Sequence, residues 1–552
     1  MTAIATNREP QQAEVGPTEL LRALLEESRE LTAVERFARA HDQDGEPAQA
    51  KYYRDLIPTG TPGEGEQYAF DVDLDACSGC KACVSACHHL NGLEADETWR
   101  SVGQLYGENG LPVIQHVTTA CHHCVDPGCL NGCPTNAYEK DPETGVVRHL
   151  DDQCFGCQYC TMACPYEVPQ YSKSKGIVRK CDMCHGRLAA GEAPACVQAC
   201  PNGAIRITVV DQQETVARTS RGLFLPDSPP SELTNPTTVY RTERGLPTNT
   251  EGADAGYAEP QHAHAPLVVM LVLTQMSVGA LAVGALAGWG GATEWADLAI
   301  VVGMLIGQMG LAVAPLHLGR PHLAFRAVLG WRHSWLSREA VMFGVYAGFS
   351  VGAAVFSVAA YWDRILPESI TSFANGFLPD VARAPTEALA IISGAVAVYC
   401  SARIYMFTGR EFWLGEKTLI KFGLTPVVLG LAVACAANSL LGGRPTSACL
   451  LLVVITSAKM AYEGALFWRL NDKDGDARLT AALQANQLRI ITAARFSFAC
   501  VGVLLTLIAS VGIAPAASSC LALLAFLGGE LAERWLYFAS VVPLRMPGGV
   551  KS

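Results

Sequence analysis

Apolar residues dominate the second half of the chain, between residues 266 and 545, in runs separated by short polar loops. A helix needs about 20 predominantly apolar residues to cross a bilayer, and most of the runs come close to that length. Eight runs in succession argue against the buried helices of a soluble protein. We therefore predict eight spans across a lipid bilayer, at about 266–289, 296–316, 338–360, 386–407, 418–438, 447–468, 492–512 and 516–540.

The first half of the chain is polar and reads as three parts. Residues 1–65 form a helical and loop extension, in which leucines at helical spacing predict one amphipathic helix from Thr18 to Ala40. We expect this helix to pack on the soluble domain, with docking to a partner as the alternative. Residues 66–210 form a domain of short strands and small helices, and residues 211–265 form an extended linker whose prolines argue against regular structure.

Cysteine is the residue that gives residues 66–210 their chemistry. Sixteen of the 21 cysteines of the chain lie here in four runs. Two runs have the spacing C-x2-C-x2-C-x3-C, which is typical of [4Fe–4S] clusters, and in two-cluster ferredoxins the fourth cysteine of a run binds the other cluster. The runs are Cys77, Cys80, Cys83 and Cys87; Cys121, Cys124, Cys129 and Cys133; Cys154, Cys157, Cys160 and Cys164; and Cys181, Cys184, Cys196 and Cys200.

Two other uses of these cysteines fit the pattern less well. A structural zinc site closes on four ligands, usually from two C-x2-C pairs, whereas sixteen clumped thiols divide evenly into four clusters. Disulfides are disfavoured because no secretory signal opens the sequence. His88, His89, His122 and His123 neighbour the cysteines, and we expect them at the domain surface rather than as ligands. The predicted fold is an α+β ferredoxin-like polyferredoxin domain followed by an all-α integral membrane bundle of eight transmembrane helices.

Charge sets the expected orientation. With an even number of spans, the cysteine-rich domain and the C-terminal tail share one side, whose loops carry fifteen Lys or Arg residues against three on the other side. Such a bias predicts that this side is cytoplasmic, in an inner (cytoplasmic) membrane. The net charge of −11 gives no reason to expect nucleic acid.

Ionisable residues in the spans mark candidate sites, because charge inside a bilayer is costly. His317 and Glu339 flank one loop on the side of the cysteine-rich domain, where a quinone would find a proton donor and acceptor. A structural role remains the alternative for both. Lys459 with Glu463, and Glu530 with Arg534, have the spacing of helical ion pairs. Since only three histidines follow residue 266, all near that loop, no haem is expected.

Several motifs carry a family resemblance. The cysteine runs resemble the four-cluster electron-transfer subunit of DMSO reductase and related molybdopterin enzymes. The membrane half resembles the anchor subunit of the same family. The motifs are Cys80-Lys-Ala-Cys83, His122-His-Cys-Val-Asp-Pro-Gly-Cys129, Cys164-Pro-Tyr-Glu-Val-Pro-Gln-Tyr171, Arg179-Lys-Cys-Asp-Met-Cys184, His317-Leu-Gly-Arg-Pro321, Ser334-Trp-Leu-Ser-Arg-Glu339 and Gly529-Glu-Leu-Ala-Glu-Arg-Trp-Leu-Tyr-Phe538.

The resemblance implies specific sites. Four [4Fe–4S] clusters would pass electrons between a quinone, bound at His317 and Glu339, and a separate molybdopterin-containing catalytic subunit. No molybdenum-cofactor site is apparent in this chain, so substrate catalysis would belong to that partner. The implied ligand sets pair the first run with the fourth and the second with the third: Cys77, Cys80, Cys83 and Cys200; Cys121, Cys124, Cys129 and Cys164; Cys133, Cys154, Cys157 and Cys160; Cys87, Cys181, Cys184 and Cys196.

The sequence departs from the family pattern in two ways. Two subunits that are normally separate are fused, and the soluble half is expected in the cytoplasm, whereas that of typical DMSO reductase is periplasmic. A cytoplasm-facing dehydrogenase, similar to membrane-bound sulfite dehydrogenase, is therefore the preferred function. A quinol-driven reductase of DMSO type and an electron-transfer subunit of a hydrogenase are the alternatives.

Overall fold

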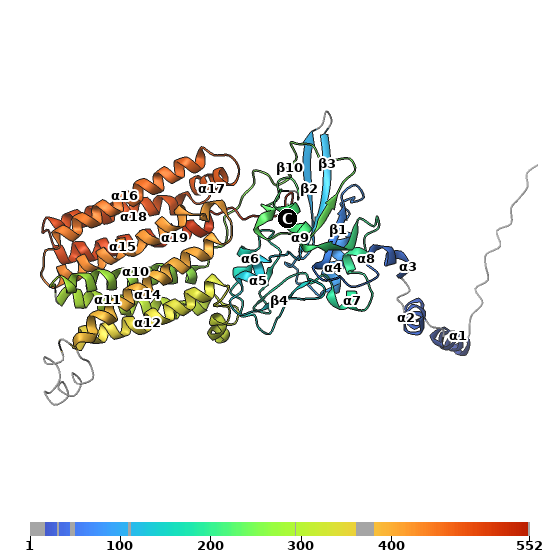
Figure 1. Cartoon of the computed structure of the whole chain (residues 1–552), viewed down its shortest axis with the longest axis horizontal. Coiled ribbons are helices and arrows are strands. Elements are labelled where there is room, and N and C mark those ends of the chain that lie inside the picture. Colours follow the sequence, from blue (N-terminus) through green and yellow to red (C-terminus); the bar gives the residue numbers. More distant parts are fainter. Residues whose placement is uncertain are drawn as a thin grey trace, which may run out of the picture.

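The protein consists of a cysteine-rich half and a helical half that meet end to end (Figure 1). The computed structural model describes residues 17–29, 32–44, 50–108, 112–222, 224–292, 294–359, 361 and 380–549. The expectation of a small α+β domain followed by a bundle of eight apolar helices is confirmed.

The N-terminal extension holds two helices where we predicted one. Helix α1 spans Pro17–Arg29 and α2 spans Ala33–Asp44. The second helix starts with a capping box, in which Thr32 Oγ1 accepts from Glu35 N at 3.2 Å and Glu35 Oε2 accepts from Thr32 N at 2.8 Å. Leu20 and Leu21 on α1 are more than half exposed, so this face is not buried against the cysteine-rich domain as expected.

Short strands and helices build the cysteine-rich half. Strand β1 pairs with β8 and β9, β2 pairs with β3 and β10, and two small hairpins complete the domain. The strands are β1 (Glu66–Asp73), β2 (Ser101–Glu108), β3 (Pro112–Thr119), β4 (Tyr138–Lys140), β5 (Val147–His149), β6 (Gln170–Ser172), β7 (Ile177–Arg179), β8 (Ile205–Asp211), β9 (Val239–Arg241) and β10 (Glu251–Gly252). The helices are α3 (Ala50–Tyr53), α4 (Ala82–Leu90), α5 (Gly128–Gly132), α6 (Tyr159–Ala163), α7 (His185–Ala189), α8 (Ala195–Gln198) and α9 (Gln212–Thr219).

The segment 211–265, expected to be an extended linker, is part of the cysteine-rich domain. It contains α9 and strands β9 and β10, which add to the two three-stranded sheets. The prolines led us to expect no regular structure, and this expectation was wrong. Proline is compatible with structure here because the prolines fall between the elements, and β9 and β10 themselves contain none.

The C-terminal tail returns to the cysteine-rich domain after the last membrane helix. Gly548 O accepts a hydrogen bond from Gln104 N in β2 at 3.1 Å. Arg545 Nε lies 2.8 Å from Asp254 Oδ2, and Met546 is buried in the domain core. The approach is close, since a Cβ on Gly103 would lie 2.5 Å from Pro547 O.

Among the residues that the structure describes, eight long helices form the membrane half, and all lie within a few residues of the predicted spans. They are α10 (Ala265–Trp289), α11 (Glu294–Val313), α12 (Trp335–Ala359), α14 (Arg383–Met406), α15 (Glu416–Leu440), α16 (Thr446–Asn471), α18 (Arg489–Ser510) and α19 (Pro515–Ala539), with the short α17 (Asp476–Ala485) in a loop. Helix α10 is the most buried and contacts α11, α14, α15 and α19. It therefore forms the centre of the bundle.

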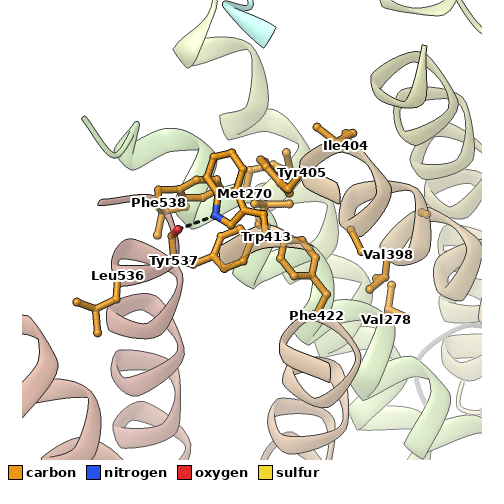
Figure 2. Close-up of a cluster of buried hydrophobic side chains, with 14 of the residues drawn as sticks. Met270, Val278, Val398, Ile404, Tyr405, Trp413, Phe422, Leu536, Tyr537 and Phe538 are labelled. Atoms are coloured by element: carbon orange, nitrogen blue, oxygen red, sulfur yellow. Dashed lines mark hydrogen bonds between the residues drawn. The ribbon is translucent and has the colours of Figure 1, made fainter. Parts of the chain in front are cut away.

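Aromatic side chains from several segments of the membrane half pack together in one buried cluster (Figure 2). Tyr405, Trp413, Phe422 and Tyr537 come from different segments, and Tyr405 lies with its ring centroid 5.3–5.7 Å from those of the other three. Trp413 Nε1 donates to Tyr537 O at 2.9 Å. The aromatic cluster joins α14, α15 and α19 where the two halves meet.

Candidate electron-transfer and quinone site

The sixteen cysteines of the four runs gather into four sets of four thiols. Two sets each line a cavity, and the members of the other two sets are electrostatic neighbours. Each set takes three thiols from one run and one from another. We name them set I (Cys77, Cys80, Cys83, Cys200), set II (Cys87, Cys181, Cys184, Cys196), set III (Cys121, Cys124, Cys129, Cys164) and set IV (Cys133, Cys154, Cys157, Cys160).

The local backbone explains how each run wraps around a centre. In the first and third runs the residues before and after the second cysteine are left-handed: Gly79 and Lys81 have φ of 73° and 61°, and Gly156 and Gln158 have φ of 75° and 60°. Glycine enters this region freely. Backbone N–H groups point at sulfur, as where Ala137 N donates to Cys133 Sγ at 3.2 Å.

These groups suit an iron–sulfur cluster. Thiolates are the ligands that clusters use, and N–H donors to sulfur are among the features that tune them. Burial, followed by the neighbouring Cys196 thiol, raises the pKa of Cys87 to about 12, so iron must displace protons on binding. Among the described residues no group of three His, Cys, Asp or Glu side chains is placed to hold a single metal ion.

We had expected the neighbouring histidines at the domain surface, but two of them, His122 and His123, are buried. His122 is 2% exposed and His123 is fully buried. Burial, followed by the charge of Arg100, lowers the pKa of His122 to about 3, and His122 Nδ1 lies 2.8 Å from Thr238 Oγ1. Both histidines are neutral parts of the core.

Set IV lies directly against the membrane half. The loop between α11 and α12 contains the short helices η3 (Ala314–His317) and η4 (Pro321–Val328). Its backbone meets that of the third run, where Gly319 N donates to Gly156 O at 3.3 Å and Arg320 N donates to Phe155 O at 3.0 Å. A Cβ on Gly319 would lie 2.2 Å from Gly176 O, so only glycine allows this approach.

The other end of the same loop holds the segment around Cys133. His333 Nε2 lies 3.1 Å from Cys133 O, Ser334 Oγ donates to Gly132 O at 2.7 Å, and Gly330 N donates to Pro134 O at 2.8 Å. The loop therefore contacts both chain segments that supply the thiols of set IV.

His317 and Glu339 lie at the two ends of this loop. His317 closes η3, and its Nδ1 atom is buried without a hydrogen-bond partner. His264, the residue before α10, is its electrostatic neighbour. The sequence prediction considered only histidines after residue 266 and so left out His264.

Glu339 is buried near the start of α12, just after its first turn, and accepts a hydrogen bond from Ser401 Oγ of α14. Tyr159, which follows Cys157 by two residues, links it to set IV. The pKa of Tyr159 is raised, first by burial and then by the nearby charges of Cys157 and Glu339. Its hydroxyl donates to Ile404 O at 2.8 Å. Tyr159 was not singled out from the sequence, although its place inside the third run was a signal.

A second group of charges lies deeper in the bundle. Lys459 Nζ donates to Glu530 Oε2 at 2.6 Å, Lys421 Nζ to Glu533 Oε1 at 2.7 Å, and Arg495 Nη2 to Glu463 Oε1 at 2.8 Å. The spacing in the sequence allowed the pairs Lys459–Glu463 and Glu530–Arg534 within single helices, but the ion pairs of Lys459 and Glu463 join neighbouring helices. The network borders a cavity of about 310 Å³ walled by Phe467, Trp468 and Phe496, among others.

Comparison with known proteins agrees with this arrangement, which defines a membrane-anchored iron–sulfur electron-transfer protein. The family model of a 4Fe–4S dicluster domain matches residues 113–210, and that of the DMSO reductase anchor subunit matches residues 260–539. The protein therefore belongs to the DMSO reductase family, as a fusion of its iron–sulfur and anchor subunits.

Curated relatives match the cysteine-rich half. The protein is 34% identical to the B subunit of the anaerobic dimethyl sulfoxide reductase of Haemophilus influenzae over 189 residues, which are 32% of this protein and 91% of the relative. It is 38% identical to the B subunit of the Escherichia coli enzyme over 155 residues, 26% of this protein and 75% of the relative. It is 37% identical to the hydrogenase-2 operon protein HybA of E. coli O157:H7 over 160 residues, 24% of this protein and 49% of the relative.

Proposed function

We propose that the chain is the electron-transfer and membrane-anchor subunit of a molybdopterin oxidoreductase complex. Sets I to IV hold four [4Fe–4S] clusters, and a separate catalytic subunit docks on the cysteine-rich domain. A quinone exchanges electrons and protons at His317 and Glu339. Substrate chemistry belongs to the partner subunit.

The docking of the α11–α12 loop on set IV is the observation that supports this proposal most directly. The loop contacts the segments around Cys133 and Gly156, and its ends carry His317 and Glu339. A cluster supplies or accepts one electron at a time. The end of the electron path therefore lies beside the two residues that handle protons.

These two residues have complementary roles at a quinone. Reduction of a quinone consumes two electrons and two protons, and oxidation of the quinol returns them. The imidazole of His317 would exchange a hydrogen bond or proton with a quinone oxygen, and the Glu339 carboxyl, held by Ser401, would take or give a proton. Tyr159 fixes the wall between Glu339 and set IV through its bond to Ile404.

The expected orientation leads us to favour electron flow toward the quinone. Fifteen basic residues on the side of the cysteine-rich domain, against three opposite, support a cytoplasmic location of that domain at the inner membrane. A cytoplasm-facing dehydrogenase such as one for sulfite, which feeds electrons to quinone, is the function we favour. A quinol-driven DMSO-type reductase has the same parts in the reverse direction.

A hydrogenase subunit is the second candidate function. The similarity to the hydrogenase-2 operon protein favours it. The metal content of the complex purified from its native membranes separates the candidates. We expect molybdenum or tungsten at about one atom per chain, whereas nickel without either metal would support the hydrogenase and contradict our proposal.

Substitutions at the quinone site test the membrane end. We expect His317→Ala and Glu339→Gln to abolish quinone turnover, because each removes a proton-handling group, and to leave the EPR signals of the clusters intact. His322→Ala is the matched control, since His322 is exposed in the same loop. Unchanged turnover in His317→Ala would remove His317 from the mechanism.

A further inference from the structure

Two buried cations lie in the gaps between the thiol sets. Lys180 is 3% exposed, and its Nζ atom lies 3.6 Å from Cys121 Sγ of set III. The same atom donates to Cys181 O, in set II, at 2.8 Å and to Val147 O. The electrostatic neighbours of Lys180 include Cys121 and Cys129 from set III and Cys181 from set II, so its ammonium group bridges these two sets.

Arg100 has the corresponding position between sets I and II. It is 2% exposed, its guanidinium stacks 4.6 Å from the centre of the Phe70 ring, and its Nη1 donates to Thr118 Oγ1 at 3.1 Å. Thr118 Oγ1 lies 3.6 Å from Cys83 Sγ of set I. The thiols around Arg100 are Cys83 from set I and Cys87, Cys181 and Cys196 from set II.

The third gap, between sets III and IV, is filled by a neutral side chain. Tyr138 is buried there, and its neighbours are Cys129 on one side and Cys133 and Cys160 on the other. Other charges near the sets lie on one set only and have their own partners. Arg187 lies near Cys184 and pairs with Glu192. Arg410 lies near Cys164 and faces Glu167. Arg320 lies near Cys154 and donates to the Asp151 carbonyl.

Neither bridging cation has a carboxylate to neutralise it. Among the described residues, no ion pair to Asp or Glu includes Lys180 or Arg100. Asp182 is an electrostatic neighbour of Lys180, but its Oδ1 accepts from Cys184 N at 2.9 Å. A buried charge without a partner is costly, and thiolate-ligated clusters on both sides supply the missing negative charge.

We propose that Lys180 and Arg100 set the reduction potentials of the clusters that they bridge, Lys180 those of sets II and III and Arg100 those of sets I and II. The inference rests on the ligand sets of the proposed function. Reduction adds one negative charge to a cluster, and a fixed cation in a medium of low dielectric stabilises that charge. Each cation therefore raises the reduction potentials of two clusters, and the potential of the cluster in set II is raised by both cations.

The test is a redox titration of the whole complex, followed by EPR. We expect Lys180→Met to lower two of the four midpoint potentials, those of sets II and III. Arg100→Met should lower those of sets I and II. One cluster, in set II, should respond to both variants, and the cluster in set IV to neither. Lys180→Arg keeps the charge and should stay close to the unaltered protein. Arg148→Met is the control, because Arg148 is in the same domain but pairs with Glu139.

Other outcomes would overturn the inference. Four unchanged potentials in Lys180→Met at full iron content would do so, as would an equal shift of all four clusters. If a methionine variant loses iron, Lys180→Gln and Arg100→Gln retain hydrogen-bond donors without charge. Loss of iron in these variants too would assign a structural role instead. Fewer than about sixteen iron atoms in the unaltered chain would contradict the ligand sets themselves.

Discussion

The two halves of the molecule bury charge in opposite ways. In the membrane half, Lys459, Lys421 and Arg495 each meet a carboxylate within 2.8 Å. In the cysteine-rich half, Lys180 and Arg100 are equally buried but face thiols. These three cations of the membrane half are therefore neutralised by carboxylates of the same half, whereas we propose that bound clusters compensate Lys180 and Arg100. The difference predicts how each half responds when one component is taken away.

Removal of iron should have the largest effect, and only in one half. Without clusters, four thiol sets and two cations remain buried without compensation, so the cysteine-rich half should lose its fold, whereas the membrane helices keep theirs. Limited proteolysis after chelation measures this, with the untreated complex as the control. We expect cleavage throughout the cysteine-rich half and a protected fragment from about Ala265 to Ala539. Equal resistance of both halves would break the comparison.

Loss of one carboxylate should destabilise the membrane half by an intermediate amount. Glu530→Gln leaves Lys459 without its partner and removes one of the two carboxylates that face Arg495. Breaking a buried pair in this way costs about 3–5 kcal/mol. The measurement is the free energy of unfolding in mixed detergent micelles.

The matched control for that substitution is Glu416→Gln at the start of α15. Glu416 is exposed, so this change should stay within about 0.5 kcal/mol of the unaltered protein. An equal loss in both variants would show that the buried network does not depend on charge pairing.

An exposed ion pair should matter least. Arg241 Nε lies 2.6 Å from Asp71 Oδ1, but the arginine side chain is 47% exposed. We expect Arg241→Gln to lower the free energy of unfolding of the cysteine-rich half by about 0–1 kcal/mol, and less at high salt, because water and ions screen the pair. Chemical denaturation of the holo protein at two salt concentrations checks this. A larger, salt-independent loss would mean that exposure does not decide the strength of these pairs.

Local patterns in the sequence predicted the architecture well. Runs of apolar residues placed all eight long helices, because the length needed to cross a bilayer is a property of one segment. The thiols that the structure groups around Cys77 or Cys121 are those that the family resemblance implied. Whether these thiols bind iron, and whether His317 and Glu339 bind quinone, remain predictions.

Long-range contacts could not be predicted in the same way. Lys459 has Glu463 one turn away in sequence, yet its partner is Glu530, because helix packing decides which faces meet. The hydrogen-bond partners of Lys421 and Tyr159 lie more than a hundred positions away in the sequence. The strands at Val239 and Glu251 exist because a sheet edge is available to them. None of these contacts can be predicted from a short segment of the sequence alone.

The returning C-terminal tail has a consequence for biosynthesis. The edge of β2 at Gln104 is completed by Gly548, which leaves the ribosome only after all eight membrane helices have been made. The cysteine-rich half is translated first but finished last. The contacts of the tail with this sheet therefore form only after the final helix has been made, so synthesis of the membrane bundle precedes completion of the electron carrier.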